Sequence, residues 1–161
     1  MHVIGLVSDT HIPRRAKELP GVLLQGLQGV DLILHAGDLV DGTVLQTLGA
    51  IAPVVAVAGN MDPPDLRKQL GTVRLLTVNK CQIGLIHGDG THGTTKSRAL
   101  TAFPAADCIV FGHSHQPLVE RHGSVLLVNP GSPTDRRLSP KFSYGLLYVN
   151  EGKAHAEIIY F

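Results

Sequence analysis

Short runs of apolar residues recur along the first two thirds of the chain, and each run stops abruptly at glycine or at polar side chains. Aliphatic and β-branched runs without strict alternation of apolar and polar positions are typical of strands that are covered on both faces. We predict such strands at Ile4–Val7, Asp31–Ala36, Val54–Ala58, Cys81–Ile86 and Asp107–Phe111.

Segments with helical spacing of apolar residues lie between most of these strands. Leu19, Leu23 and Leu27, for example, fall on one face of a helix. The predicted helices are Leu19–Leu27, Asp41–Leu48, Asp65–Leu70 and Thr95–Phe103.

The last third of the chain has the pattern of an antiparallel β meander, with turn signals between short apolar strands. The strands predicted there are Val119–Arg121, Val125–Val128, Tyr144–Val149 and His155–Tyr160, and an earlier hairpin joins Val73–Val78 to Cys81–Ile86. Helix-connected strands followed by hairpins indicate a single α/β domain over residues 1–161, in which helices flank two packed sheets.

The first strand ends in Asp9 and His11, which are two positions apart. In open α/β sheets, chemically active groups project from the carboxyl ends of strands. If the backbone stays extended through Thr10, both side chains point the same way. A carboxylate and an imidazole that share one partner suit a divalent metal ion, although the same residues could also cap a turn.

The same arrangement, an apolar strand followed by potential metal ligands, recurs along the chain. The seven candidates are Asp9, His11, Asp38, Asn60, His87, His113 and His115. This number of donors exceeds what one ion with open positions needs, and it suits two ions that share a ligand. A carboxylate is the group best able to bridge two ions, because each of its oxygens accepts more than one partner.

Composition and charge argue against several other classes of protein. The chain has nine His and no Trp, and its formal net charge of +1 provides no strong field for nucleic acids or anionic membranes. No apolar run is long enough to span a membrane and no basic leader precedes the first strand, so we expect a cytoplasmic protein. The high aliphatic content leaves room for a homo-oligomer.

Two smaller features of the sequence carry less information. Cys81 and Cys108 have neither metal-ligand spacing nor the pattern of a disulfide framework, and Cys108 is expected to be a core residue. A basic cluster at Arg136, Arg137 and Lys141 is expected to be a solvated loop.

The ordered motifs resemble those of the calcineurin-like metallophosphoesterase superfamily, up to about residue 132. The matching motifs are Asp9-Thr10-His11, Gly37-Asp38, Gly59-Asn60, His87-Gly88 and Gly112-His113-Ser114-His115. The short length and the Asn129-Pro130-Gly131-Ser132 stretch resemble the small single-domain bacterial and archaeal phosphodiesterase branch. The resemblance implies a four-layer αββα sandwich of two mixed β-sheets with a two-metal site.

The resemblance also implies a reaction and a role for each candidate. Two ions ~3.5–4 Å apart can hold a bridging hydroxide for in-line attack on a phosphate diester. We expect a small phosphodiester substrate and manganese as the metal, with nickel, iron, cobalt and zinc as alternatives. Asp38, Asn60 and His113 are expected to take part directly in catalysis. The implied ligands are Asp9, His11 and His115 for the first ion, Asn60, His87 and His113 for the second, and Asp38 between the two.

Two positions depart from the family pattern. Met61 follows Gly59-Asn60, where many members carry a histidine that is thought to protonate the leaving group. Methionine donates no proton, and general acid catalysis usually contributes about 100- to 10,000-fold in rate. We therefore expect activated aryl diesters to be cleaved far better than alkyl diesters. Asp89 stands where related small phosphodiesterases often have a second histidine. Asp89 and His92 are expected to lie in a solvated loop rather than to act as substitute acids.

Three other functions are compatible with parts of this pattern. The small vacuolar sorting subunit of retromer resembles the same fold but is a protein-binding scaffold with a degraded metal centre, whereas every ligand position here carries a competent donor. A metal-dependent nuclease is disfavoured by the small size, near-neutral charge and few aromatic residues. A His-x-His amidohydrolase barrel needs roughly 250 residues, more than this chain has.

Overall fold

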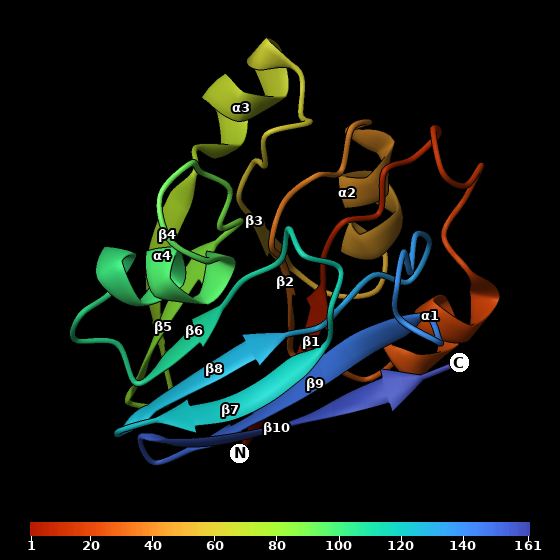
Figure 1. Cartoon of the computed structure of the whole chain (residues 1–161). Coiled ribbons are helices and arrows are strands. Elements are labelled where there is room, and N and C mark those ends of the chain that lie inside the picture. The colour runs from red at the N-terminus through yellow and green to blue at the C-terminus, as the bar shows by residue number, and fades with distance from the viewer.

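The computed structural model describes all 161 residues and contains two five-stranded sheets (Figure 1). The first sheet has the strand order β10-β9-β1-β2-β3 and the second β4-β5-β6-β8-β7. The strands are β1 His2–Val7, β2 Leu32–His35, β3 Val54–Ala56, β4 Val73–Val78, β5 Cys81–Ile86, β6 Cys108–Val110, β7 Leu118–His122, β8 Val125–Asn129, β9 Ser143–Asn150 and β10 Lys153–Tyr160. The helices are α1 Gly21–Gly26, α2 Thr43–Gly49, α3 Pro64–Leu70 and α4 Thr95–Ala102.

Three apolar clusters divide the molecule into four layers. The central cluster lies between the sheets, where Leu6 and Leu34 of the first sheet pack with Ile83 and Val110 of the second. A second cluster joins α1, α2 and α3 to the outer face of the first sheet, and a third joins α4 to the second sheet. The prediction of two packed mixed sheets flanked by helices, an αββα sandwich, is confirmed.

The parallel strands determine where polar side chains gather. β1, β2 and β3 are neighbours in parallel in the first sheet, and β5, β6 and β8 are neighbours in parallel in the second. The carboxyl ends of parallel strands meet at one edge of a sheet, so the loops after these strands lie together. None of the helices is long and apolar enough to cross a lipid bilayer.

The prediction of one antiparallel meander in the last third is wrong. β7 and β8 pair with each other in the second sheet, but the chain then crosses to the first sheet, where β9 pairs antiparallel with β1 and β10 forms the edge. Leu126 and Val128 of β8 and Leu147 and Val149 of β9 all face the central cluster. Both hairpins therefore bury the same kind of apolar face, and local turn signals specify a hairpin without specifying the sheet that it joins.

Candidate metal centre

All seven candidate ligands predicted from the sequence lie at the carboxyl ends of strands and meet in one place. Asp9 and His11 follow β1, Asp38 follows β2, Asn60 follows β3, His87 follows β5, and His113 and His115 follow β6. Their potential ligand atoms form two groups within which the atoms lie no more than 4.8 Å apart, Asp9 with His11 and His115, and Asp38 with His87 and His113. Strands from both sheets contribute to the site, which therefore depends on how the sheets pack together.

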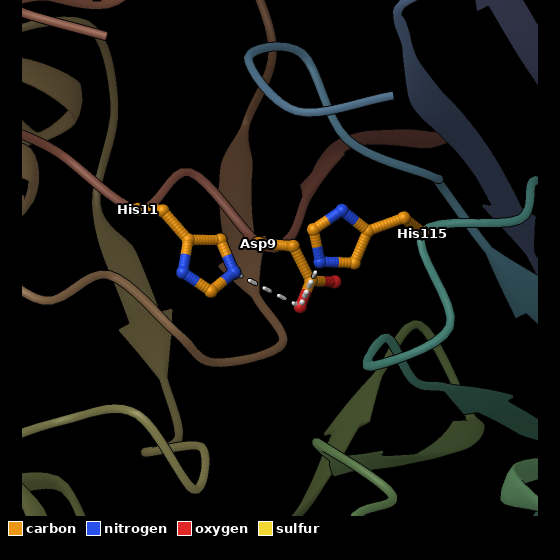
Figure 2. A group of neighbouring side chains, drawn as sticks. All are labelled: Asp9, His11 and His115. Carbon is orange, nitrogen blue, oxygen red and sulfur yellow. Dashed lines mark ion pairs between the residues drawn. The ribbon is translucent and has the colours of Figure 1, made fainter. Parts of the chain in front are cut away.

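The first group surrounds one oxygen of Asp9. Asp9 Oδ1 lies 3.4 Å from His115 Nε2 and 3.8 Å from His11 Nε2, and both ring nitrogens point toward it (Figure 2). The other oxygen, Oδ2, accepts hydrogen bonds from the Ser8 hydroxyl at 2.7 Å and from the backbone N–H of His113 at 3.0 Å. One oxygen of Asp9 is thus held by the protein while the other faces two imidazoles.

The second group has the same construction around Asp38. Asp38 Oδ1 accepts a hydrogen bond from the backbone N–H of Met61 at 2.8 Å, and Oδ2 lies 3.0 Å from His87 Nε2. The same His87 nitrogen is 3.1 Å from Asn60 Oδ1 and 3.3 Å from His113 Nδ1. Asn60 is therefore brought to the second group even though it is exposed.

Asp38 lies between the two groups. Its Oδ2 atom is 3.0 Å from His87 of the second group and 3.6 Å from His11 of the first. A carboxylate oxygen with two lone pairs can face partners on two sides. This position is the one that a bridging ligand requires.

Several atoms at the centre have no hydrogen-bond partner in the protein. Asp9 Oδ1, His11 Nε2 and His115 Nε2 are buried and unpaired, and they point at one another. Leaving a polar atom buried and unpaired costs about 1–3 kcal/mol, and more if it is charged. A divalent cation among these atoms would give each of them a partner, and mixed nitrogen and oxygen donors are the set that such ions bind. The residues present therefore fit divalent metal ions.

The pKa shifts show a site that attracts positive charge. Burial opposes ionisation of Asp9, but the neighbouring His11 and His115 outweigh it and hold the pKa of Asp9 far below its usual range. Burial likewise disfavours the charged form of His87, yet the carboxylates of Asp38 and Asp9 raise its pKa to about 9. Without metal, the imidazolium of His87 compensates part of the carboxylate charge. The pKa of the partly exposed His113 is lowered by burial and by His87.

Backbone carbonyls orient two of the histidines. His87 Nδ1 lies 2.8 Å from the carbonyl of Ala36, and His115 Nδ1 is bonded to the carbonyl of Asp135. Because a carbonyl only accepts, Nδ1 must carry the proton in both rings. The Nε2 lone pair of a neutral ring then faces the centre, which is the tautomer a metal ligand needs.

Most of the candidate ligands have a left-handed backbone conformation, which is uncommon for residues other than glycine. Those with positive φ are Asp9 (57°), His11 (46°), Asp38 (59°), His113 (72°) and His115 (59°). The backbone from Asp9 to His11 therefore does not stay extended, although the two side chains still converge. A tight left-handed turn aims each side chain back across the strand ends, and the surrounding hydrogen bonds hold it there.

Asp62 is the most important supporting residue that sequence reasoning missed. Its buried carboxylate accepts backbone hydrogen bonds from Asp38 at 2.9 Å, Val40 at 2.6 Å and Gly59 at 2.8 Å. It thereby ties the loop after β2 to the loop after β3. The only signal in the sequence is its position two residues after Asn60, where an acidic side chain follows a strand-end turn.

A second set of supporting residues comes from the loop after β8. The Ser132 hydroxyl donates to the carbonyl of Asp9 at 2.8 Å, and Thr134 donates to the carbonyl of Thr10 at 2.6 Å. Asp135, in the same loop, contacts His115 as described above. The Asn129-Pro130-Gly131-Ser132 stretch indicated a family resemblance, but its hydrogen bonds to the first loop could not be predicted from local pattern.

Two glycines at the centre are required by close approach. A Cβ atom at Gly59 would overlap Asp38 Oδ1, and one at Gly112 would overlap the Ser8 hydroxyl and lie 2.7 Å from Asp9 Oδ2. The glycines before Asn60 and His113 therefore make room for the two carboxylates.

The residues that depart from the family pattern are exposed at the surface. Met61 has 42% of its surface exposed. Asp89 and His92 are both exposed, as expected for a solvated loop. Arg98 holds this loop by donating to the carbonyls of Gly88 at 2.8 Å and His92 at 3.0 Å.

Sequence and structure comparisons find similar proteins over almost the whole chain. A "probable metallophosphoesterase" of Methanothermobacter thermautotrophicus is 40% identical over 159 residues, which cover 98% of this chain and 91% of that protein. A phosphodiesterase of Methanocaldococcus jannaschii is 27% identical over 139 residues, 80% of this chain and 82% of that protein. Among solved structures, wild-type Vps29 of Entamoeba histolytica complexed with zinc superposes with a TM-score of 0.78 at 22% identity, covering 98% of both chains.

The sequence profile of the calcineurin-like phosphoesterase superfamily domain matches residues 1–152, a range that contains every candidate ligand described above. The strand-end donors, the two sheets and this match agree, and the chain belongs to the calcineurin-like phosphoesterase superfamily.

Proposed function

We propose that this protein is a phosphodiesterase that uses two divalent metal ions, with manganese as the expected metal. Asp9, His11 and His115 would hold one ion, and Asn60, His87 and His113 the other, with Asp38 between them. The observation that carries the proposal is the set of buried, unpaired donor atoms at the ends of β1 and β6. A protein that binds no metal ion at this place would leave these buried polar atoms without partners, at a cost in stability.

The burial of the ligands indicates where a substrate enters. Asp9, His11, Asp38, His87 and His115 are buried, whereas His113 is partly exposed and Asn60 is exposed. Asn60 and His113 are therefore the ligands that a phosphate ester can contact first from solvent. Bound divalent ions would supply an activated water molecule and stabilise negative charge on the phosphoryl group.

The chain's own residues provide position and charge for this reaction. Asp9 and Asp38 are each held through one oxygen, so their second oxygens are preorganised before any ligand binds. Two carboxylates offset only two of the four positive charges that two divalent ions bring. The centre therefore stays net positive and attracts an anionic phosphate.

The phosphodiesterase among the relatives supports diester rather than monoester cleavage as the proposed reaction. Met61 stands beside Asn60 and can donate no proton to a leaving group. An aryloxide leaves without protonation more readily than an alkoxide, so activated aryl diesters should be the better substrates.

The first experiment measures hydrolysis of bis-p-nitrophenyl phosphate by protein loaded with Mn²⁺. We expect turnover, and we expect Asp38→Ala and His113→Ala to abolish it while both variants keep the wild-type circular dichroism spectrum. His122→Ala is the matched control, because His122 is an exposed histidine on β7 outside the centre. Activity that survives both substitutions at the centre would refute the proposal.

A protein-binding scaffold is the alternative, since the fold is shared with Vps29. A scaffold that binds metal would show Mn²⁺ binding in calorimetry but no turnover of any aryl diester or monoester. Measuring binding and turnover on the same preparation separates the two functions.

A further inference from the structure

We propose that Arg15 and Arg137 form an anion subsite beside the metal centre, which selects phosphodiesters that carry a second phosphate group. The inference rests on the proposed function, because it names the substrate class of the same site. It concerns a basic pair that the sequence alone did not bring together, since one residue follows β1 and the other follows β8.

Asp135 lies within ion-pair distance of both arginines. Its Oδ2 atom lies 3.3 Å from Arg15 Nε, 3.9 Å from Arg137 Nε and 3.9 Å from His115 Nδ1. The opposite nitrogen of the His115 ring faces Asp9 (Figure 2). The two guanidinium groups therefore lie one imidazole ring and one carboxylate away from the centre.

The backbone also ties the pair to the metal centre. The N–H of Arg15 donates to the carbonyl of His11 at 2.8 Å, and the N–H of Asp135 donates to the Ser132 hydroxyl at 2.9 Å, which in turn binds the carbonyl of Asp9. Both arginines are thus carried by segments that are fastened to ligand residues. The backbone that carries the arginines is therefore held by the same loops that position the ligands.

The two positive charges of Arg15 and Arg137 exceed the single negative charge of Asp135. One guanidinium is enough to balance one carboxylate, so the second leaves a net positive charge at this edge. Asp135 is 14% exposed, whereas the side chains of Arg15 and Arg137 are 62% and 48% exposed. Both arginines turn Nε toward Asp135, and the structure shows no ion pair from their terminal nitrogens. Those nitrogens are available to an anion from solvent.

Arginine in particular suits a phosphate at this place. The planar guanidinium donates two parallel hydrogen bonds to phosphate oxygens, which the ammonium of lysine does not do. A simple aryl diester has one negative charge, and that charge is used at the metal centre. A second phosphate elsewhere in the same small molecule would supply the dianion that two converging arginines recognise.

The test compares two substrates that differ only by one phosphate. The p-nitrophenyl ester of thymidine 5′-phosphate is measured with and without a 3′-phosphate, and the quantity is the ratio of the two kcat/KM values. For the wild-type protein we expect a ratio of roughly ten in favour of the 3′-phosphorylated substrate at low ionic strength. Arg15→Gln and Arg137→Gln should each lower the ratio, and the double variant should bring it to about one.

Arg136→Gln is the matched control, because Arg136 is in the same loop but donates to the carbonyl of Pro140 and lies over the Phe142 ring. It should keep the wild-type ratio. A wild-type ratio near one would overturn the subsite, as would variants of Arg15 and Arg137 that lower both kcat/KM values equally. The second result would mean that the arginines only position His115 through Asp135.

A binding measurement separates failure of the subsite from failure of the proposed function. Calorimetry on Mn²⁺-loaded protein compares thymidine 3′,5′-bisphosphate with thymidine 5′-phosphate and needs no turnover. We expect the bisphosphate to bind roughly tenfold more tightly and the double variant to lose this difference. Equal binding would overturn the subsite, and so would tighter binding of a short oligothymidylate without a terminal phosphate, which would indicate a nucleic-acid strand instead.

Discussion

Replacing Asp62 by alanine is expected to destabilise the protein and to weaken its metal binding. The Asp62 carboxylate is buried and accepts three backbone hydrogen bonds, from Asp38, Val40 and Gly59. Alanine removes the acceptor and leaves three N–H groups without a partner. Because Asp38 has a left-handed backbone conformation, losing its backbone contact also releases the carboxylate that lies between the two ligand groups.

The size of the expected destabilisation follows from the three hydrogen bonds that Asp62 accepts. A hydrogen bond to a charged group contributes about 1.5–3 kcal/mol, and contributions within one network are not additive. Solvent can reach part of this loop because the neighbouring Asn60 and Met61 are exposed. We therefore expect Asp62→Ala to lower the free energy of unfolding by about 3–5 kcal/mol. Asp62→Asn keeps one acceptor oxygen and should cost about 2 kcal/mol.

Urea unfolding in the presence of a chelator measures the stability of the metal-free protein, and calorimetry with Mn²⁺ measures metal affinity. We expect affinity to fall about 10- to 100-fold in Asp62→Ala, as is usual when a group that orients a metal ligand is lost. Asp65→Ala is the control, because Asp65 is an exposed carboxylate in the first turn of α3 and should contribute only about 0.3–1 kcal/mol. If the free energy of unfolding of Asp62→Ala lies within about 1 kcal/mol of the wild-type value, the reasoning is refuted.

Three further predictions concern the centre. Met61→His should raise the rate on alkyl diesters by up to about 100-fold and change aryl diesters little, measured as the ratio of the two kcat values. Mn²⁺ affinity should fall about tenfold for each pH unit below pH 9. Asp38 raises the pKa of His87 to about 9, and the His87 ring must lose its proton before it can bind metal. Calorimetry with Mn²⁺ between pH 6 and pH 9 measures this dependence. Gly59→Ala should weaken Mn²⁺ binding by more than about tenfold, because the added Cβ overlaps Asp38, whereas Gly49→Ala at the open end of α2 should leave it unchanged.

Each of these predictions has an outcome that contradicts it. Equal gains on both leaving groups would show that Met61→His does not act as a proton donor. Mn²⁺ affinity that is independent of pH would mean that His87 is already neutral in the metal-free protein. Wild-type Mn²⁺ affinity in Gly59→Ala would show that Asp38 can move without loss of binding.

Local pattern was sufficient for most of the secondary structure. The predicted strand Val54–Ala58 is observed as Val54–Ala56, and the predicted helix Thr95–Phe103 as Thr95–Ala102. Hydrophobic periodicity is a local property, and a buried strand or an amphipathic helix needs it whatever its neighbours are. The ends of these elements shift by one or two residues, as is usual where terminal residues make only part of an element's hydrogen bonds.

The sequence also identified the seven residues that the structure brings together, because each follows an apolar strand and has a side chain that can bind metal. It could not indicate how they converge. Asp9 and His11 meet through left-handed backbone rather than through an extended strand. The N–H groups of Asp9 and His11 donate to the carbonyls of Gly37 and Asp38, and the Ser132 hydroxyl donates to the carbonyl of Asp9.

The sequence by itself therefore determined the α/β class and the candidate donors, since both follow from residue type and short-range spacing. Only the tertiary structure decided which sheet each C-terminal hairpin joins, that Asp62 holds two ligand loops, and that Arg15 and Arg137 meet at Asp135. These features depend on contacts between segments far apart in the chain. A local sequence pattern does not specify such contacts. An apolar face or a backbone N–H group can pair with several different segments, and only the packing of the whole core selects one of them.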